Sequence, residues 1–541
     1  MEKKRREWKQ EFSEYVGKEN EKSNQLEKEG NQNNEKSSSG FADLANPKEK
    51  SSGFFGSGEP RGEIIRVRQT ANPSSGFAGE PRGNGNRPAT GGSVLLQQEA
   101  SRTCILSKQW LHVWRETTNI EFNENFFHAP QEADEETLIM QRNVFIRFVR
   151  QFITNYPQKS IQRFALTCSN PQEFLPDVKA FVGFALSRNV TELELDFSNP
   201  NWREDDDHSH ESSSMFELPV ETYELIKGSV VSLKLFACRF DAYGVSNFSI
   251  LKSVSLGWIG LSICSIKCVL VNCPLIESLS LKNCWGLQSF EIPSPSLKLK
   301  TFVIDKCNLI EDFFMIEGSK LEFLKYSGTI APFYISSPRN LKEADLDFGL
   351  QTEFDADFGY VLYDFLQEIY AAKVLTLCSV FLQIIPQGEE PFGFQVSLDV
   401  RHLILKTAMH FNEYFGIRFM LNSCPLLEIL TFDIGPAIIF HDYTPPFQFN
   451  PHDFWLKNLI VLKCVKKRLR VINVKGFKGT WNELYVLRYL IHFGDKLKRV
   501  NLYISNEEGD NGENRETYLA RTQFLLKIRQ PHQHLPVLSF L

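Results

Sequence analysis

A short hydrophobic pattern of the form L-x-x-L-x-L recurs along the chain from Phe164 onward. Its clearest copy spans residues 273–284, where Leu279 and Leu281 form the apolar pair. Such a pair predicts a short strand, because alternate side chains of a strand point to the same face. The other copies are residues 190–195, 230–235, 251–256, 299–304, 321–326, 341–346, 373–377, 401–405, 427–432 and 459–462.

The spacing of these copies indicates how they stack. From Val254 through Leu279 and Phe302 to Leu324, the pattern returns every 22 to 25 residues, a period typical of leucine-rich repeats. One repeat cannot bury its own apolar pair, so we expect an α/β leucine-rich-repeat solenoid whose polar strand positions line a concave surface. The alternative is an ordinary α/β domain with strands at this spacing.

Three cysteines fit the repeat. Cys238, Cys284 and Cys307 each follow the second apolar residue of a pair by three positions, a position that holds Asn or Cys and faces a buried turn in leucine-rich repeats. None of the 11 cysteines forms a CxxC pair. We therefore expect packing rather than zinc binding or reactivity.

The residues before the repeats divide into three parts. Residues 1–30 are rich in charged residues and could form a solvated helix, whereas residues 29–92 are rich in Gly, Ser, Asn, Pro and Glu. We expect a disordered low-complexity tail over residues 1–93. A compact helical segment is expected over residues 94–127. Within a linker region, 128–160, apolar residues at helical spacing predict a longer helix over residues 134–154.

Composition narrows the class of function. With 42% hydrophobic residues and a net charge of −6, the chain has no global attraction to nucleic acid or to anionic membranes. The sequence contains no run of about 20 apolar residues, so we expect no transmembrane helix. The charged residues 1–6 are followed by no apolar stretch, so we expect no secretory signal. We expect a protein of the cytoplasm, the nucleus or both, with reduced thiols.

The common motifs of catalysis and phosphate binding are absent from the sequence. We expect no enzyme, no catalytic residues, no cofactor and no metal. The acidic run at residues 204–211 is either a solvated loop or a divalent-cation site. The basic residues Lys466, Lys467, Arg468, Arg470 and Lys475 form a local patch, but the acidic chain favours no nucleic-acid role.

Residues 101–114, which contain Leu-Ser-Lys-Gln-Trp-Leu-His-Val-Trp, resemble the second half of a plant F-box. Trp110 and Trp114 are four residues apart, so they share one helix face and could simply anchor a small core. The family's Leu-Pro opening and most of its first helix are absent from residues 86–98. The resemblance implies adaptor binding by Leu106, Ser107, Trp110 and Trp114.

A second resemblance lies at the C-terminus. The string Lys-Gly-Phe-Lys-Gly-Thr-Trp-Asn-Glu-Leu at residues 475–484 is similar to the FBD domain of plant F-box/LRR proteins. We therefore divide the ordered chain into an F-box-like segment (94–127), repeats (161–455) and an FBD-like domain (456–541). In the last we expect a helix over residues 483–490, a closing strand over residues 500–504 and a capping role.

Together the resemblances imply a substrate receptor of an SCF-type cullin–RING E3 ubiquitin ligase, which holds an adaptor protein and an unknown target protein. The alternative is a leucine-rich-repeat scaffold that has lost adaptor coupling, because half of the F-box is missing. Candidate target-binding residues, chosen as strand positions that face the concave surface, are Glu192, Glu194, Ser232, Lys234, Ser278 and Ser280.

Overall fold

The computed structural model describes residues 117–126, 135–199, 202, 215–240, 248–287, 290–292, 298–307, 314–317, 320–336, 338–385, 396–456, 461–509, 512–526 and 536–541. All of them lie in one compact unit, Glu63–Leu541. The predicted tail, residues 1–93, and most of the predicted helical segment, residues 94–116, lie outside the described residues.

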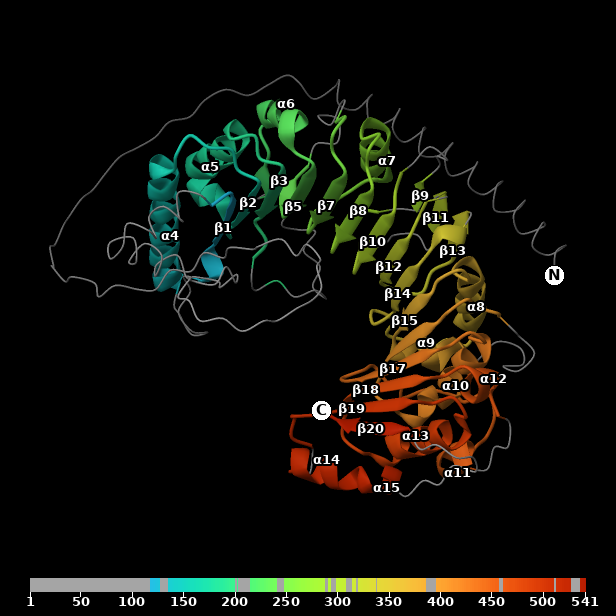
Figure 1. The fold of residues 1–541 in the computed structure, drawn as a ribbon. Coiled ribbons are helices and arrows are strands. Elements are labelled where there is room, and N and C mark those ends of the chain that lie inside the picture. The colour runs from blue at the N-terminus through green and yellow to red at the C-terminus, as the bar shows by residue number, and fades with distance from the viewer. Residues whose placement is uncertain are drawn as a thin grey trace, which may run out of the picture. The chain divides into compact units, whose positions relative to one another are not determined.

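The centre of the fold is a 15-stranded sheet in which neighbouring strands are parallel and follow one another in chain order (Figure 1). The strands are β1 (Asn119–Asn123), β2 (Arg163–Thr167), β3 (Glu192–Asp196), β5 (Ser232–Phe236), β7 (Ser253–Gly257), β8 (Ser278–Lys282), β10 (Thr301–Asp305), β12 (Phe323–Ser327), β14 (Glu343–Asp347), β15 (Val374–Leu377), β16 (His402–Thr407), β17 (Ile429–Ile434), β18 (Val471–Phe477), β19 (Arg499–Ile504) and β20 (Val537–Phe540).

Helices connect these strands, and Figure 1 shows α4 to α13 on one side of the sheet. They are α4 (Glu135–Asn155), α5 (Leu175–Ser187), α6 (Val220–Ser229), α7 (Ile263–Asn272), α8 (Phe358–Glu368), α9 (Ser379–Ile384), α10 (Tyr414–Ser423), α11 (Pro451–Leu456), α12 (Lys463–Lys467), α13 (Trp481–Phe493), α14 (Arg515–Arg521) and α15 (Gln523–Leu526). Four single turns are η1 (Glu124–Phe126), η2 (Pro171–Phe174), η5 (Pro338–Asn340) and η7 (Phe411–Glu413). Two small sheets are also present. One joins β9 (Phe290–Ile292), β11 (Phe314–Glu317) and β13 (Phe333–Ser336), and the other joins β4 (Phe216–Glu217) and β6 (Cys238–Arg239).

The L-x-L pairs form the strands as predicted. In β8, Leu279 and Leu281 are 1% and 0% exposed, whereas the flanking Ser278 and Ser280 are half-buried. The same alternation makes strands of ten of the eleven predicted copies. The prediction of an α/β, leucine-rich-repeat type of fold is therefore confirmed at the level of its parallel sheet.

A recurring turn ends the strands. Ala237, Trp258, Asn283 and Lys306 directly follow β5, β7, β8 and β10, and all have φ between 49° and 52°. Each backbone N–H donates to the carbonyl oxygen of the last residue of the next strand, at 2.8–3.0 Å. The turn directs the following residue into the core, which explains why Cys238, Cys284 and Cys307 are buried.

The first strand corrects the predicted helical segment. Residues 119–123 form β1, which pairs with β2, so the prediction that the segment stays helical up to residue 127 is wrong. The residues themselves alternate, since Ile120 and Phe122 are buried between half-buried polar neighbours. This period of two favours a strand, and the pattern at this position was too short to be recognised as a repeat.

The predicted long helix is present as α4, but it is not a linker. Phe145, Val149 and Phe152 are buried, and the Phe152 ring packs edge-on against Phe122 of β1 with ring centroids 5.1 Å apart. The helix therefore covers the first strands and belongs to the core.

Three predictions at the C-terminal end also change. Of the predicted copy at residues 459–462, residues 459–460 lie outside the described residues, and residues 461–462 form no strand and lead into α12. A contiguous apolar run does not distinguish a strand from a buried segment that leads into a helix. The boundary at residue 456 does not separate two sheets, since β18 pairs with β17. The strand predicted over residues 500–504 is present as β19, but it does not close the sheet, because β20 pairs with it.

The C-terminal motif builds the start of α13. Gly476 has φ +69°, and a Cβ atom there would lie 2.2 Å from the carbonyl oxygen of Ile434. The buried Glu483 carboxylate accepts hydrogen bonds from the N–H groups of Lys478 and Gly479 at 3.0 and 2.9 Å. It also accepts one from the Thr480 hydroxyl at 2.9 Å, so these residues form a helix cap.

Replacing a buried strand residue tests the stacking. Leu279→Ala should lower the free energy of unfolding by roughly 2–5 kcal/mol, because it leaves a cavity in the middle of the sheet. The neighbouring Ser280→Ala, which changes a half-buried residue outside the core, should change it by less than about 0.5 kcal/mol. Urea unfolding measures both, and equal effects would contradict the assigned strand faces.

Candidate functional site

One face of the 15-stranded sheet is covered by none of the helices α4 to α13 (Figure 1), and we call it the open face. Its side chains come from the strand positions that alternate with the buried ones. The six predicted target-binding residues all occupy such positions: Glu192 and Glu194 on β3, Ser232 and Lys234 on β5, and Ser278 and Ser280 on β8. Whether they bind a target stays a prediction.

An ion network joins part of this set. Arg163 on β2 contacts Glu194 at 2.7 Å and Glu121 on β1 at 3.1 Å, and Lys234 also pairs with Glu194. Burial alone would raise the pKa of Glu194, but the hydrogen bonds and charges of Lys234 and Arg163 outweigh it and lower that pKa. Glu192 is exposed and, within the described residues, carries no ion pair. It is therefore the more available carboxylate of the two.

The serines belong to a wider hydroxyl-bearing patch that sequence reasoning only partly found. The register places Ser253 of β7 beside Ser278 of β8, and Ser255 beside Ser280. On the other side of β7, Ser253 lies beside Ser232 of β5. The S-x-S pattern of β7 matches that of β8, so it was a usable signal. These serines are uncharged, which distinguishes the patch from the ion network around Arg163.

A second group of charges lies on β14, where Glu343, Asp345 and Asp347 take the open-face positions. Lys406 of β16 reaches across β15 and contacts Asp345 at 3.2 Å. The described residues provide no ion pair for Asp347, whose Oδ1 atom accepts the backbone N–H of Gly349 at 3.0 Å. Lys406 and Asp345 are 61 positions apart in the chain, so only the strand order brings them together.

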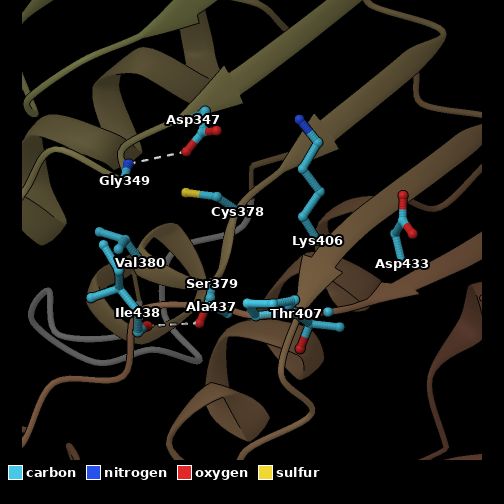
Figure 2. Close-up of a pocket in the computed structure, with 12 residues that line it drawn as sticks. Asp347, Gly349, Cys378, Ser379, Val380, Lys406, Thr407, Asp433, Ala437 and Ile438 are labelled. Atoms are coloured by element: carbon cyan, nitrogen blue, oxygen red, sulfur yellow. Dashed lines mark hydrogen bonds between the residues drawn. The ribbon is translucent and has the colours of Figure 1, made fainter. Parts of the chain in front are cut away.

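A hollow of about 590 Å³ opens beside this acidic strand (Figure 2). It is formed by the ends of β14 to β17 and by the segments that follow them. Its lining residues are Asp347, Gly349, Cys378, Ser379, Val380, Lys406, Thr407, Asp433, Gly435, Pro436, Ala437 and Ile438. Sequence reasoning named none of them as functional.

The predicted basic patch is divided between two places. Lys466 and Lys467 lie on α12, whereas Lys475 is on β18 and pairs with Asp433 at 3.4 Å. The five residues therefore do not form one surface for a phosphate backbone.

Other predicted chemistry has no counterpart in the described part of the chain. There, no group of three or more His, Cys, Asp or Glu side chains is arranged to hold a metal ion. The acidic run at residues 204–211 and the adaptor-binding residues Leu106, Ser107, Trp110 and Trp114 lie outside the described residues. Among the described helices, none has the length and apolar character to cross a membrane.

This chain is similar in sequence to known plant proteins over most of its length. A family model described as "FBD-associated F-box protein At5g56370, LRR repeats" matches residues 180–334. The F-box/LRR-repeat protein At5g54820 of Arabidopsis thaliana is 33% identical over 426 residues, which cover 76% of this chain and 88% of that protein. F-box protein At3g62230 of the same plant is 33% identical, with the same two coverages.

A buried carboxylate lies behind the hollow. Thr407 lines the hollow, and its hydroxyl donates to Glu413 at 2.7 Å. The backbone N–H of His410 donates to the same carboxylate at 2.6 Å. Burial raises the pKa of Glu413 to about 7, against 4.5 for an ordinary glutamate.

This raised pKa predicts a pH dependence of stability. The folded protein holds the proton more tightly, so the contribution of Glu413 is fully present below pH 4.5 and is lost as pH rises through about 7. Relative to Glu413→Gln, wild type should therefore lose roughly 1–3 kcal/mol of unfolding free energy between pH 4.5 and 8. Urea unfolding of both proteins at several pH values measures this, and a pH-independent difference would contradict it.

Proposed function

This chain belongs to the plant F-box/LRR-repeat family, and we propose that it is the substrate-recognition subunit of an SCF-type cullin–RING E3 ubiquitin ligase. The observation that carries the proposal is the open face of the sheet. Its charged and hydroxyl-bearing side chains alternate with the core residues, so they are available for a partner while the buried positions maintain the fold.

We propose that the repeats form a solenoid whose open face is concave and holds the target protein. Glu192, Ser232, Ser278 and Ser280 present one carboxylate and three hydroxyl groups on β3, β5 and β8. Glu194 and Lys234 contribute through the ion network that also contains Arg163. A rigid sheet holds these groups at constant spacing, which favours recognition of one surface over others.

The F-box-like segment supports the second half of the proposal. Trp110 and Trp114, with Leu106 and Ser107, would contact the adaptor protein of the ligase. A receptor of this kind performs no chemistry itself, so we propose that the chain is not an enzyme. We also propose that it acts in the cytoplasm, the nucleus or both.

The second candidate function is a protein-binding scaffold without ligase coupling. The observation in its favour is that residues 86–98 lack the Leu-Pro opening and most of the first helix of the F-box family. The two candidates share the open face and differ only in adaptor binding, so one titration distinguishes them.

The first experiment is a titration of the full chain against a plant SCF adaptor. We expect saturable binding that Trp110→Ala/Trp114→Ala weakens by at least about tenfold, because buried aromatic anchors commonly contribute 2 kcal/mol or more to an interface. An open-face variant, Ser278→Arg/Ser280→Arg, should leave this affinity unchanged. Absence of binding by every form would favour the scaffold.

The second experiment tests the open face. Affinity capture from plant extract with wild type should retain proteins that Ser278→Arg/Ser280→Arg loses, because two long cations would fill the uncharged patch between β5 and β10. The matched control, Cys264→Arg/Val271→Arg, places two arginines on exposed positions of α7, and it should retain those proteins. Loss in both variants, or in neither, would contradict target binding by this face.

A further inference from the structure

The hollow beside β14 has walls that the fold holds in place. Gln383 of α9 is fully buried, and its side-chain amide donates to the carbonyl oxygen of Ile438 at 2.8 Å. Its side-chain oxygen accepts the N–H of Phe440 at 3.0 Å, and the Ser379 hydroxyl donates to Ile438 at 3.2 Å. The segment after β17 is therefore anchored to α9 by three hydrogen bonds, so this wall is preorganised.

The charges around the hollow favour a cation. Lys406 is neutralised by Asp345, at 3.2 Å, and Asp433 is partly neutralised by Lys475, at 3.4 Å. Asp347 has no ion pair within the described residues, and one of its two oxygens accepts only the Gly349 N–H. Figure 2 shows Asp347 and Asp433 on opposite sides of Lys406. An anion would approach two carboxylates and find a lysine that is already paired.

The remaining lining is apolar or uncharged. Val380, Pro436, Ala437 and Ile438 line the hollow with hydrocarbon surface. Burial, followed by the negative charge of Asp347, raises the pKa of the Cys378 thiol to about 12, so this thiol stays neutral at physiological pH. A long side chain with an aliphatic stem and a cationic head matches both parts of such a cavity.

We propose that this hollow receives an arginine or lysine side chain from a basic segment of the target protein, with the cationic head on Asp347 and the stem against Val380 and Ile438. The proposal rests on the proposed role of the open face in target binding and adds the chemistry of an anchor point. An arginine fits best, because its planar guanidinium can bond a carboxylate through two parallel N–H groups.

The test uses the full chain and two synthetic peptides, acetyl-Gly-Leu-Arg-Gly-Gly-amide and its counterpart with uncharged citrulline in place of arginine. Saturation-transfer NMR titrations give both affinities. We expect the arginine peptide to bind at least about fivefold more tightly than the citrulline peptide, because a charge-assisted hydrogen bond contributes more than a neutral one.

Two variants with the same charge change separate the hollow from the rest of the strand. Asp347→Asn keeps the oxygen that accepts Gly349, and it should weaken the arginine peptide about five- to tenfold and remove its advantage over citrulline. Glu343→Gln removes a carboxylate from the same strand outside the hollow, and its affinity should stay within about twofold of wild type. Circular dichroism melting curves should agree for all three proteins.

The proposal is overturned if the two peptides bind equally, if neither binds at millimolar concentration, or if Asp347→Asn and Glu343→Gln weaken binding alike. The adaptor titration on the same protein samples keeps this result separate from the proposed function. Adaptor binding without preference for the arginine peptide would reject only the anchor, whereas loss of adaptor binding alone would reject only the ligase coupling.

Discussion

The whole sheet depends on one constraint, which is that a single L-x-L pair has nothing of its own to bury against. Leu279 and Leu281 of β8 are covered because Val254 and Leu256 lie beside them on one side, and Phe302 and Ile304 on the other. The backbone obeys the same rule, since each strand-ending turn donates its N–H to the next strand. Stability is therefore shared between neighbours, as in other one-dimensional repeat arrays.

Because the apolar pairs on one face of the sheet stabilise the fold, the open face is available for function. Because buried and open positions alternate, polar residues such as Glu192 or Asp347 occupy a strand without disturbing the core. The register then decides which open-face residues meet. Lys406 pairs with Asp345 across an intervening strand. Arg163 of β2 pairs with Glu121 on one neighbouring strand and with Glu194 on the other. Recognition by such a face is a property of several repeats together.

The C-terminal motif has a structural explanation that separates it from recognition. Gly476, Thr480 and Glu483 form the approach to α13 and its cap, and Gly476 also makes room for the backbone of β17. An earlier unit, formed by β16 and α10, uses a related arrangement, in which the buried Glu413 accepts the N–H of His410 before α10. The segment that resembles an FBD domain thus extends the sheet with the same kind of strand and helix as the repeats before it.

The sequence by itself determined the repeating strand, its buried face and the positions of the inward cysteines, because these follow from local alternation and a regular period. It also placed the six candidate residues on the open face. Only the tertiary structure decided what required strand order: β1 as a strand, the partners of Glu194, and the hollow between Asp347 and Asp433. Those features join residues tens of positions apart through loops of unequal length. Local patterns carry no information about which distant side chains share one end of the sheet.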